Sequence, residues 1–71
     1  MNALGREIKC HPQDLEWVVE QLKKIPFIHL IDGVVNSYSK CYDREGTLKE
    51  KGLYRREANT KLRNYVRRVN K

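Results

Sequence analysis

The chain has 71 residues, of which 39% are hydrophobic and 34% charged, and its formal net charge at pH 7 is +6. This length excludes a multidomain protein and this composition excludes a disordered chain, so we expect a single domain over residues 1–71. The positive charge favours anionic partners, which are nucleic acid, an acidic protein surface or an anionic membrane surface.

Cysteine usage and hydropathy bear on the compartment. Cys10 and Cys41 form no CxxC pair, and two cysteines do not build the disulfide framework of a secreted domain. The first ten residues contain no apolar signal segment, and no apolar run is long enough to cross a bilayer. We therefore expect a cytoplasmic protein with two free thiols, and a Cys10–Cys41 disulfide is the alternative.

Residues 1–10 show no clear periodicity. Gly5 separates the apolar residues Leu4 and Ile8, and charged residues lie between and beyond them. A segment without a periodic apolar face has little to hold it in place. We expect a loose N-terminal arm, free or laid over the helices.

The first predicted helix spans residues 12–25. Pro12 suits the first helical position because its missing N–H would have no helical partner there. Apolar residues recur with the period of one helix face, at Leu15, Val18, Val19, Leu22 and Ile25. Trp17 lies beside this stripe, where we expect it at the edge of the core, and an exposed position that binds a partner is the alternative.

Pro26 ends the first helix, and the second predicted helix spans residues 27–45. Its apolar stripe is about 160° wide, against roughly 100° for an ordinary surface helix, and comprises Phe27, Ile31, Val34, Val35, Tyr38, Cys41 and Tyr42. The width favours the central helix of a bundle, and a contact with a second copy or another protein is the alternative. His29 and Asp32 share the polar side, where we expect solvated side chains and no metal or acid–base site.

Gly46 suits the end of the second helix, and residues 46–52 are predicted to form a flexible loop. The third predicted helix spans residues 53–70. Its apolar face comprises Tyr54, Ala58, Leu62, Tyr65, Val66 and Val69. The sequence therefore predicts an all-α fold, a small three-helix bundle with helices at about 12–25, 27–45 and 53–70.

The positive charge is concentrated in residues 51–71, which contain eight Lys and Arg residues and one acid, Glu57. Arg56, Arg63 and Arg67 fall within about 40° of one another, opposite the apolar stripe. A face that is only solvated usually mixes both signs, so this imbalance favours an anion-binding surface. The predicted nucleic-acid contacts are Arg55, Arg56, Lys61, Arg63, Arg67, Arg68 and Lys71, and further candidates for partner binding are Trp17, Asn59 and Asn64.

Catalytic, cofactor and metal motifs are missing from the sequence. There is no glycine-rich phosphate loop, no H-E-x-x-H or G-x-S-x-G motif and no paired Cys/His spacing for zinc. The long link before the basic helix differs from a helix-turn-helix, and no alternating strand pattern indicates a sheet-based RNA-binding module. We expect a protein that is not an enzyme and uses neither cofactor nor metal.

Part of the chain resembles small proteins encoded by bacteriophages and prophages of enteric bacteria. The resemblance covers residues 38–66 and is carried by Tyr42-Asp43-Arg44 and by the pattern R-R-x-A-N-x-x-L-R, here residues 55–63. It implies a single-domain helical protein from a replication, recombination or host-takeover region, and it transfers no catalytic residue.

Two functions are consistent with these features. In the first, the chain is a nucleic-acid-binding accessory protein in phage or prophage replication, recombination or regulation, with DNA favoured over RNA, and it uses its basic C-terminal helix. In the second, it is a small helical adaptor or inhibitor that docks on a host or phage enzyme by the basic face and the apolar stripe of the second helix. A homodimer is compatible with either. We expect no membrane binding, because the apolar face of the third helix is weak.

Overall fold

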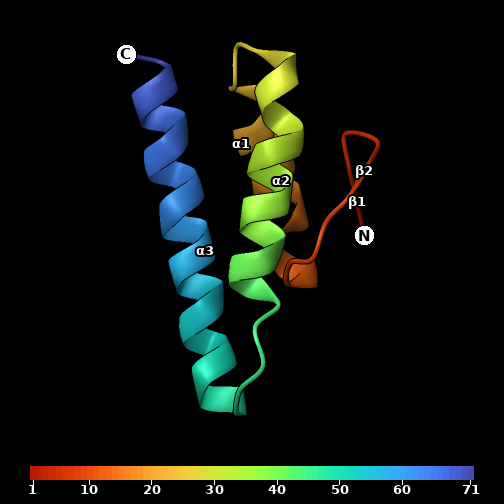
Figure 1. Cartoon of the computed structure of the whole chain (residues 1–71), viewed down its shortest axis with the longest axis vertical. Coiled ribbons are helices and arrows are strands. Elements are labelled where there is room, and N and C mark those ends of the chain that lie inside the picture. Colours follow the sequence, from red (N-terminus) through yellow and green to blue (C-terminus); the bar gives the residue numbers. More distant parts are fainter.

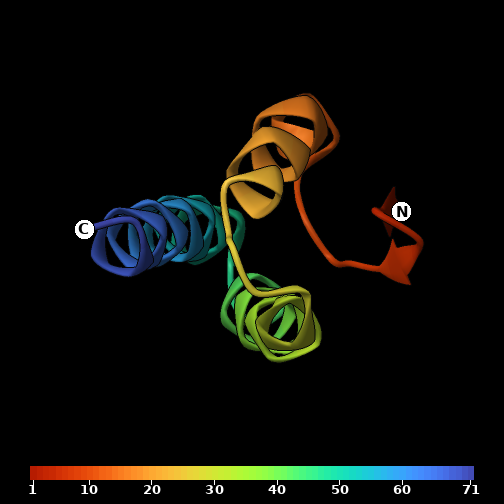
Figure 2. The ribbon, with the colours of Figure 1, turned by 90° about the horizontal axis from the view of Figure 1, so that it is seen from above.

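The computed structural model describes all residues 1–71 and contains three helices and a short β-hairpin (Figure 1). Helix α1 spans Leu15–Lys23, α2 spans Ile28–Tyr42 and α3 spans Leu48–Val69. Seen from above, the three helices occupy the corners of a triangle (Figure 2). This arrangement confirms the predicted all-α fold, a small three-helix bundle.

The core lies where the apolar stripes of the three helices meet. α1 contributes Val18 and Leu22, which are almost completely enclosed, and the other buried helical residues include Ile31, Val35, Tyr38, Ala58, Leu62 and Val66. These positions belong to the stripes predicted from the sequence. Phe27 is the exception: it is 53% exposed, because it precedes the first turn of α2 and extends beyond the bundle.

The N-terminal segment forms a hairpin of two short strands, β1 (Asn2–Ala3) and β2 (Arg6–Glu7). Its two-residue turn has positive φ at both positions, 54° at Leu4 and 81° at Gly5. Such turns match the twist of antiparallel strands, and glycine adopts positive φ without the penalty of a Cβ. Gly5, which the sequence suggested as an interruption, is therefore the residue that allows the hairpin to close.

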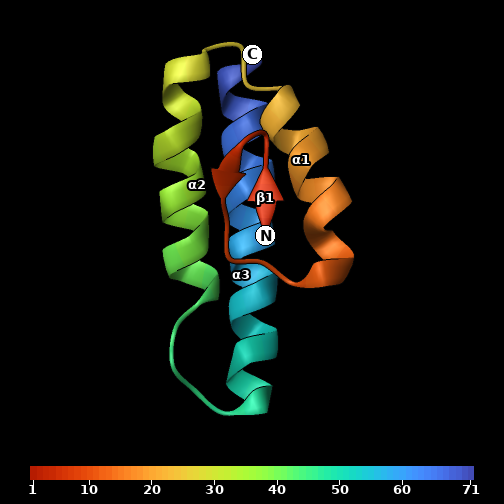
Figure 3. The same ribbon diagram turned by 90° about the vertical axis from the view of Figure 1, so that its right-hand side faces the viewer.

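The hairpin fills the space between α1 and α2, with β1 against α1 and β2 against α2 (Figure 3). Ala3, Ile8 and Cys10 are buried there, and the backbone N–H of Lys9 donates to Ser39 Oγ at 3.0 Å. The expectation of a loose arm is corrected on this point. The segment has no long periodic face, but three small or apolar side chains suffice to cover one groove of the bundle.

The first helical turn is tighter than predicted. Residues Pro12–Asp14 form a 3₁₀ turn, and the His11 side chain accepts a hydrogen bond from the N–H of Gln13 at 3.1 Å. Pro12 lies at the first position, as expected from its lack of an N–H. The α-helix proper begins at Leu15 and ends at Lys23, two residues before the predicted end.

The boundary between α2 and α3 differs from the prediction. Thr47 Oγ1 accepts from the N–H of Glu50 at 3.2 Å, and the Glu50 carboxylate accepts from the N–H of Thr47 at 3.1 Å. This capping box satisfies two donors of the first turn, so α3 begins at Leu48 and continues through Gly52. The predicted loop at 46–52 was wrong, and the connection is residues 43–47.

Candidate nucleic-acid interface

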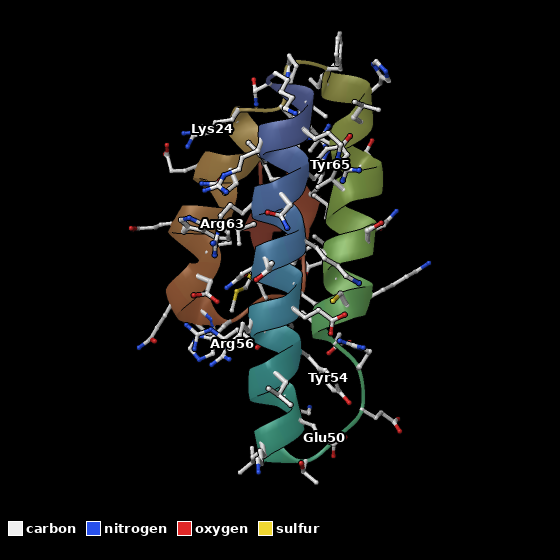
Figure 4. All side chains as sticks on the ribbon, turned by 90° about the vertical axis from the view of Figure 1, so that its left-hand side faces the viewer. Lys24, Glu50, Tyr54, Arg56, Arg63 and Tyr65 are labelled. Carbon is white, nitrogen blue, oxygen red and sulfur yellow. The ribbon has the colours of Figure 1, made fainter.

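Four cations share the outward side of α3, which we call the basic face: Lys49, Arg56, Arg63 and Arg67. Neighbouring members are seven or four residues apart, close to whole numbers of helical turns. All four are exposed, and none forms an ion pair within the chain. Figure 4 places Arg56 and Arg63 on the α1 side of α3, whereas Tyr65 lies on the α2 side. Lys49 was missed because its helical turn had been assigned to a loop.

Arg55 is half-buried and held against the start of α1. Its Nε and Nη2 donate to the two oxygens of Asp14 at 2.7 and 2.8 Å, which is the bidentate geometry that suits a guanidinium and a carboxylate. These hydrogen bonds hold the pKa of Asp14 below its usual range, although burial opposes the shift. The same bonds raise the pKa of Arg55. Arg55 was predicted as a nucleic-acid contact, but its guanidinium is occupied by Asp14.

Asn59 extends this ion pair into a network between three elements. Its Nδ2 donates to Asp14 at 3.0 Å, and its Oδ1 accepts the hydroxyl of Tyr38 on α2. Burial raises the pKa of the Tyr38 phenol. Asn59 was a candidate for partner binding, but both ends of its amide are used within the bundle. The network fixes the start of α1, the middle of α2 and α3 relative to one another.

Lys61 and Arg68 lie on the α2 side of α3, away from the basic face. Lys61 Nζ is 3.2 Å from one oxygen of Glu57, whose other oxygen accepts from Arg44 at 2.5 Å. Arg44 chiefly, and Lys61 next, lower the pKa of Glu57. The Arg68 guanidinium lies 5.9 Å from the centroid of the Tyr65 ring. Glu57, the only acid of residues 51–71, is thus shared by two cations and leaves the basic face unneutralised.

A groove between α1 and α3 runs beside the basic face; it measures about 530 Å³ and is lined by Trp17, Gln21, Lys24, Arg63, Val66, Arg67 and Asn70. Trp17 is half-buried and packs against the core, which agrees with the expected position at the edge of the core. The rest of its surface lines the groove. Lys24 lines the groove from α1, near Arg63 of α3, and adds a cation that sequence reasoning had not selected (Figure 4). Asn70 closes the upper end, where its Nδ2 donates to the Lys24 carbonyl at 2.8 Å.

The remaining predicted positions are distributed over other parts of the surface. Lys71 follows the end of α3, is exposed and forms no ion pair. Asn64 is exposed and lies on the opposite groove, between α2 and α3. Of the seven predicted contacts, the structure therefore brings together Arg56, Arg63 and Arg67 on one face.

The sequence also allowed predictions about metal-binding groups, the cysteines and membrane-spanning helices. No group of three or more His, Cys, Asp or Glu side chains is arranged to hold a metal ion. Both cysteines are free thiols: Cys10 is buried, which raises its pKa, and Cys41 is half-buried on α2. None of the three helices combines the length and the apolar character that crossing a bilayer requires.

No protein-family model, curated protein sequence or solved structure matches the chain. The resemblance to small phage and prophage proteins therefore stays a prediction, and the proposals that follow are argued from the geometry of the chain itself.

Proposed function

We propose that the chain is a nucleic-acid-binding accessory protein whose contact surface is the basic face of α3, extended by Lys24. One observation carries the proposal: the two acids that form ion pairs with α3 bind cations outside the basic face, Asp14 with Arg55 and Glu57 with Arg44 and Lys61. The cations of the basic face are consequently left exposed and unpaired over about 27 Å of helix, from Lys49 to Arg67.

Phosphate is the ligand that this surface suits. Arginine binds phosphate oxygens in a planar, bidentate manner, and three of the four cations on the basic face are arginines. A straight, rigid helix can lie against the phosphate backbone or enter the major groove of a duplex. Thr60 is exposed between Arg56 and Arg63 and supplies a hydroxyl for sugar or base edges. We favour DNA over RNA, and the phage or prophage role follows from the resemblance of residues 38–66.

The test is the salt dependence of binding. We expect the double substitution Arg63→Ala/Arg67→Ala to reduce the magnitude of the negative slope of log K against log salt by about 1.8 units on duplex DNA, because each lost phosphate contact removes about 0.9. Lys9→Ala/Lys40→Ala is the matched control. It removes the same charge from exposed residues that form no ion pair, one just after the hairpin and one on α2.

Fluorescence anisotropy with labelled duplex DNA, single-stranded DNA and RNA of one sequence gives all the slopes in one series. The control should leave the slope nearly unchanged. If both double variants lower it equally, the chain attracts nucleic acid through its net charge alone and the basic face is no binding surface. A parent slope near zero would exclude the function.

A further inference from the structure

The second groove along α3 has a different lining. It runs between α2 and α3, measures about 570 Å³, and is lined by Leu30, Gly33, Val34, Ser37, Tyr38, Cys41, Ala58, Lys61, Leu62, Asn64, Tyr65 and Arg68. On α2 it extends from Leu30 to Cys41, which is about 17 Å or three helical turns. Leu30, Val34 and Tyr65 are only half-buried in it. The hairpin covers the α1–α2 groove, but nothing in the chain covers this one.

Gly33 has no role inside the chain that explains a glycine. It lies in the middle of α2 with ordinary helical backbone, and a Cβ built on it would meet no atom within 4 Å. A glycine inside a helix lowers stability relative to alanine, so the position favours close approach by another backbone. Ser37 lies one turn further along the same rim, and it too is small. Because neither residue has a large side chain, another helix can approach the α2 backbone closely at these positions.

The rim charge selects among possible occupants. The lining contains two cations, Lys61 and Arg68, and no acid. Glu57 lies beside Lys61 but is shared with Arg44, and Arg68 forms no ion pair, so this edge of the groove keeps a net positive charge. A second copy of this chain is a poor occupant, because each copy carries a net charge of +6 and a symmetric contact would bring the two cationic rims together. An acidic helix meets the same rim with opposite charge and covers the apolar floor.

We propose that the α2–α3 groove binds an amphipathic helix of an acidic partner protein. The apolar face of that helix packs on Leu30, Val34 and Tyr65, its backbone lies against Gly33 and Ser37, and its carboxylates lie beside Lys61 and Arg68. This goes beyond nucleic-acid binding and does not depend on it, because the groove shares no residue with the basic face.

Cys41 provides a reporter of occupancy in the unmodified chain. Cys41 is half-buried and lines the groove, whereas Cys10 is only 5% exposed. The rate of Cys41 alkylation by iodoacetamide, followed by mass spectrometry, is measured with a synthetic amphipathic helix of about four turns. One peptide carries Leu and Ala on its apolar face with flanking Glu, and the control peptide carries Lys in place of Glu. We expect the Glu peptide to slow alkylation at least tenfold at saturation, and the Lys peptide to leave it unchanged.

Two glycine variants separate an effect on peptide binding from an effect on the stability of the fold. Gly33→Ala and Gly52→Ala both place a methyl group in open space on a helix, so each should raise Tm by several degrees, about 4–8 °C at most. Only Gly33→Ala adds that methyl group to the groove. We expect it to weaken the Glu peptide about tenfold, because a close-packed contact cannot accept an extra methyl without strain, and Gly52→Ala to leave the affinity unchanged.

Four results would overturn the proposal. They are no protection of Cys41 by the Glu peptide, equal protection by both peptides, equal affinities of the two glycine variants, and sedimentation of a dimer whose dissociation on dilution exposes Cys41. The last result would assign the groove to a second copy of the chain. The Arg63→Ala/Arg67→Ala variant should bind the Glu peptide as the parent does, which keeps this test apart from that of nucleic-acid binding.

Discussion

Lys and Arg residues on the two sides of α3 form different contacts. Toward α1, Asp14 accepts hydrogen bonds from both Arg55 and Asn59, and the cations of the basic face remain without an ion pair. Toward α2, Glu57 is shared by Arg44 and Lys61 over an apolar groove. The difference teaches that the number of cations does not define the binding surface of a small basic protein. The few acids define it, by deciding which cations they neutralise.

This division gives the chain two surfaces with separate chemistry. The basic face and Lys24 suit phosphate, and the α2–α3 groove suits an apolar helix with acidic flanks. Leu62 belongs to the core that holds α3 in place: it is 3% exposed and lines the floor of the α2–α3 groove. Variants that act on the shared core, on the α1 side or only on the start of α3 should therefore have effects of decreasing size.

The largest effect on stability is expected from Leu62→Ala, which removes core packing on which both sides of α3 depend. Truncating a buried leucine costs about 2–5 kcal/mol, a large share of the stability of a domain this small. Urea unfolding followed by circular dichroism measures the change. Leu48→Ala is the matched control, because Leu48 lies on the same helix and is 91% exposed. Similar losses in the two variants would contradict the assignment of Leu62 to the core.

A smaller effect, confined to the α1 side, is expected from Asp14→Ala. The substitution leaves the Arg55 guanidinium and the Asn59 amide without their acceptor, and we expect a loss of about 1–3 kcal/mol at pH 7. Urea unfolding of the parent and the variant gives the difference, with Glu45→Ala as a control that removes an exposed acid without an ion pair. A variant as stable as the parent would mean that the network does not anchor α3.

The stability difference between the parent and Asp14→Ala should depend on pH in a defined direction. Because Arg55 lowers the folded-state pKa of Asp14 below its ordinary value of 3.8, the carboxylate stabilises the fold fully above that value. This contribution is lost as the pH falls through the lowered folded-state pKa. The stability difference between parent and Asp14→Ala should thus be largest near neutrality and shrink below pH 3.8. A difference that stays constant into acid would contradict the ion pair.

The smallest effect on stability is expected from Thr47→Ala, which removes the capping box and leaves both grooves intact. Loss of an N-cap hydroxyl typically costs about 1 kcal/mol. The first turns of α3 line neither groove, so peptide binding at Cys41 should not change. Thermal unfolding measures the stability and iodoacetamide protection measures the groove. A loss of protection would show that the start of α3 is coupled to the groove.

Most of the helical architecture follows from local patterns. The stripes of α1 and α3 predicted the buried residues Val18, Leu22, Leu62 and Val66, because a periodic apolar face has few ways to avoid water other than packing. The start of α3 was also present in the sequence, as Thr47 and Glu50 three residues apart, but the glycine-containing segment was assigned to a loop. Capping outweighs a single glycine when both ends of the capping box are satisfied.

The hairpin and the division of the cations depended on tertiary structure. Residues 1–10 lack the periodicity that predicts order, and their position is fixed by the groove between α1 and α2 that Ala3 and Ile8 fill. A helical wheel places Arg55 beside the apolar stripe, but it cannot show that Asp14, 41 residues earlier, lies within hydrogen-bond distance.

The sequence by itself determined that three amphipathic helices form and that the last one carries the positive charge, since both depend on residue type and spacing along one chain segment. Only the tertiary structure decided which cations remain free and which groove stays open. Those properties depend on contacts between segments far apart in the chain, where a single carboxylate or a two-residue turn changes what the surface presents.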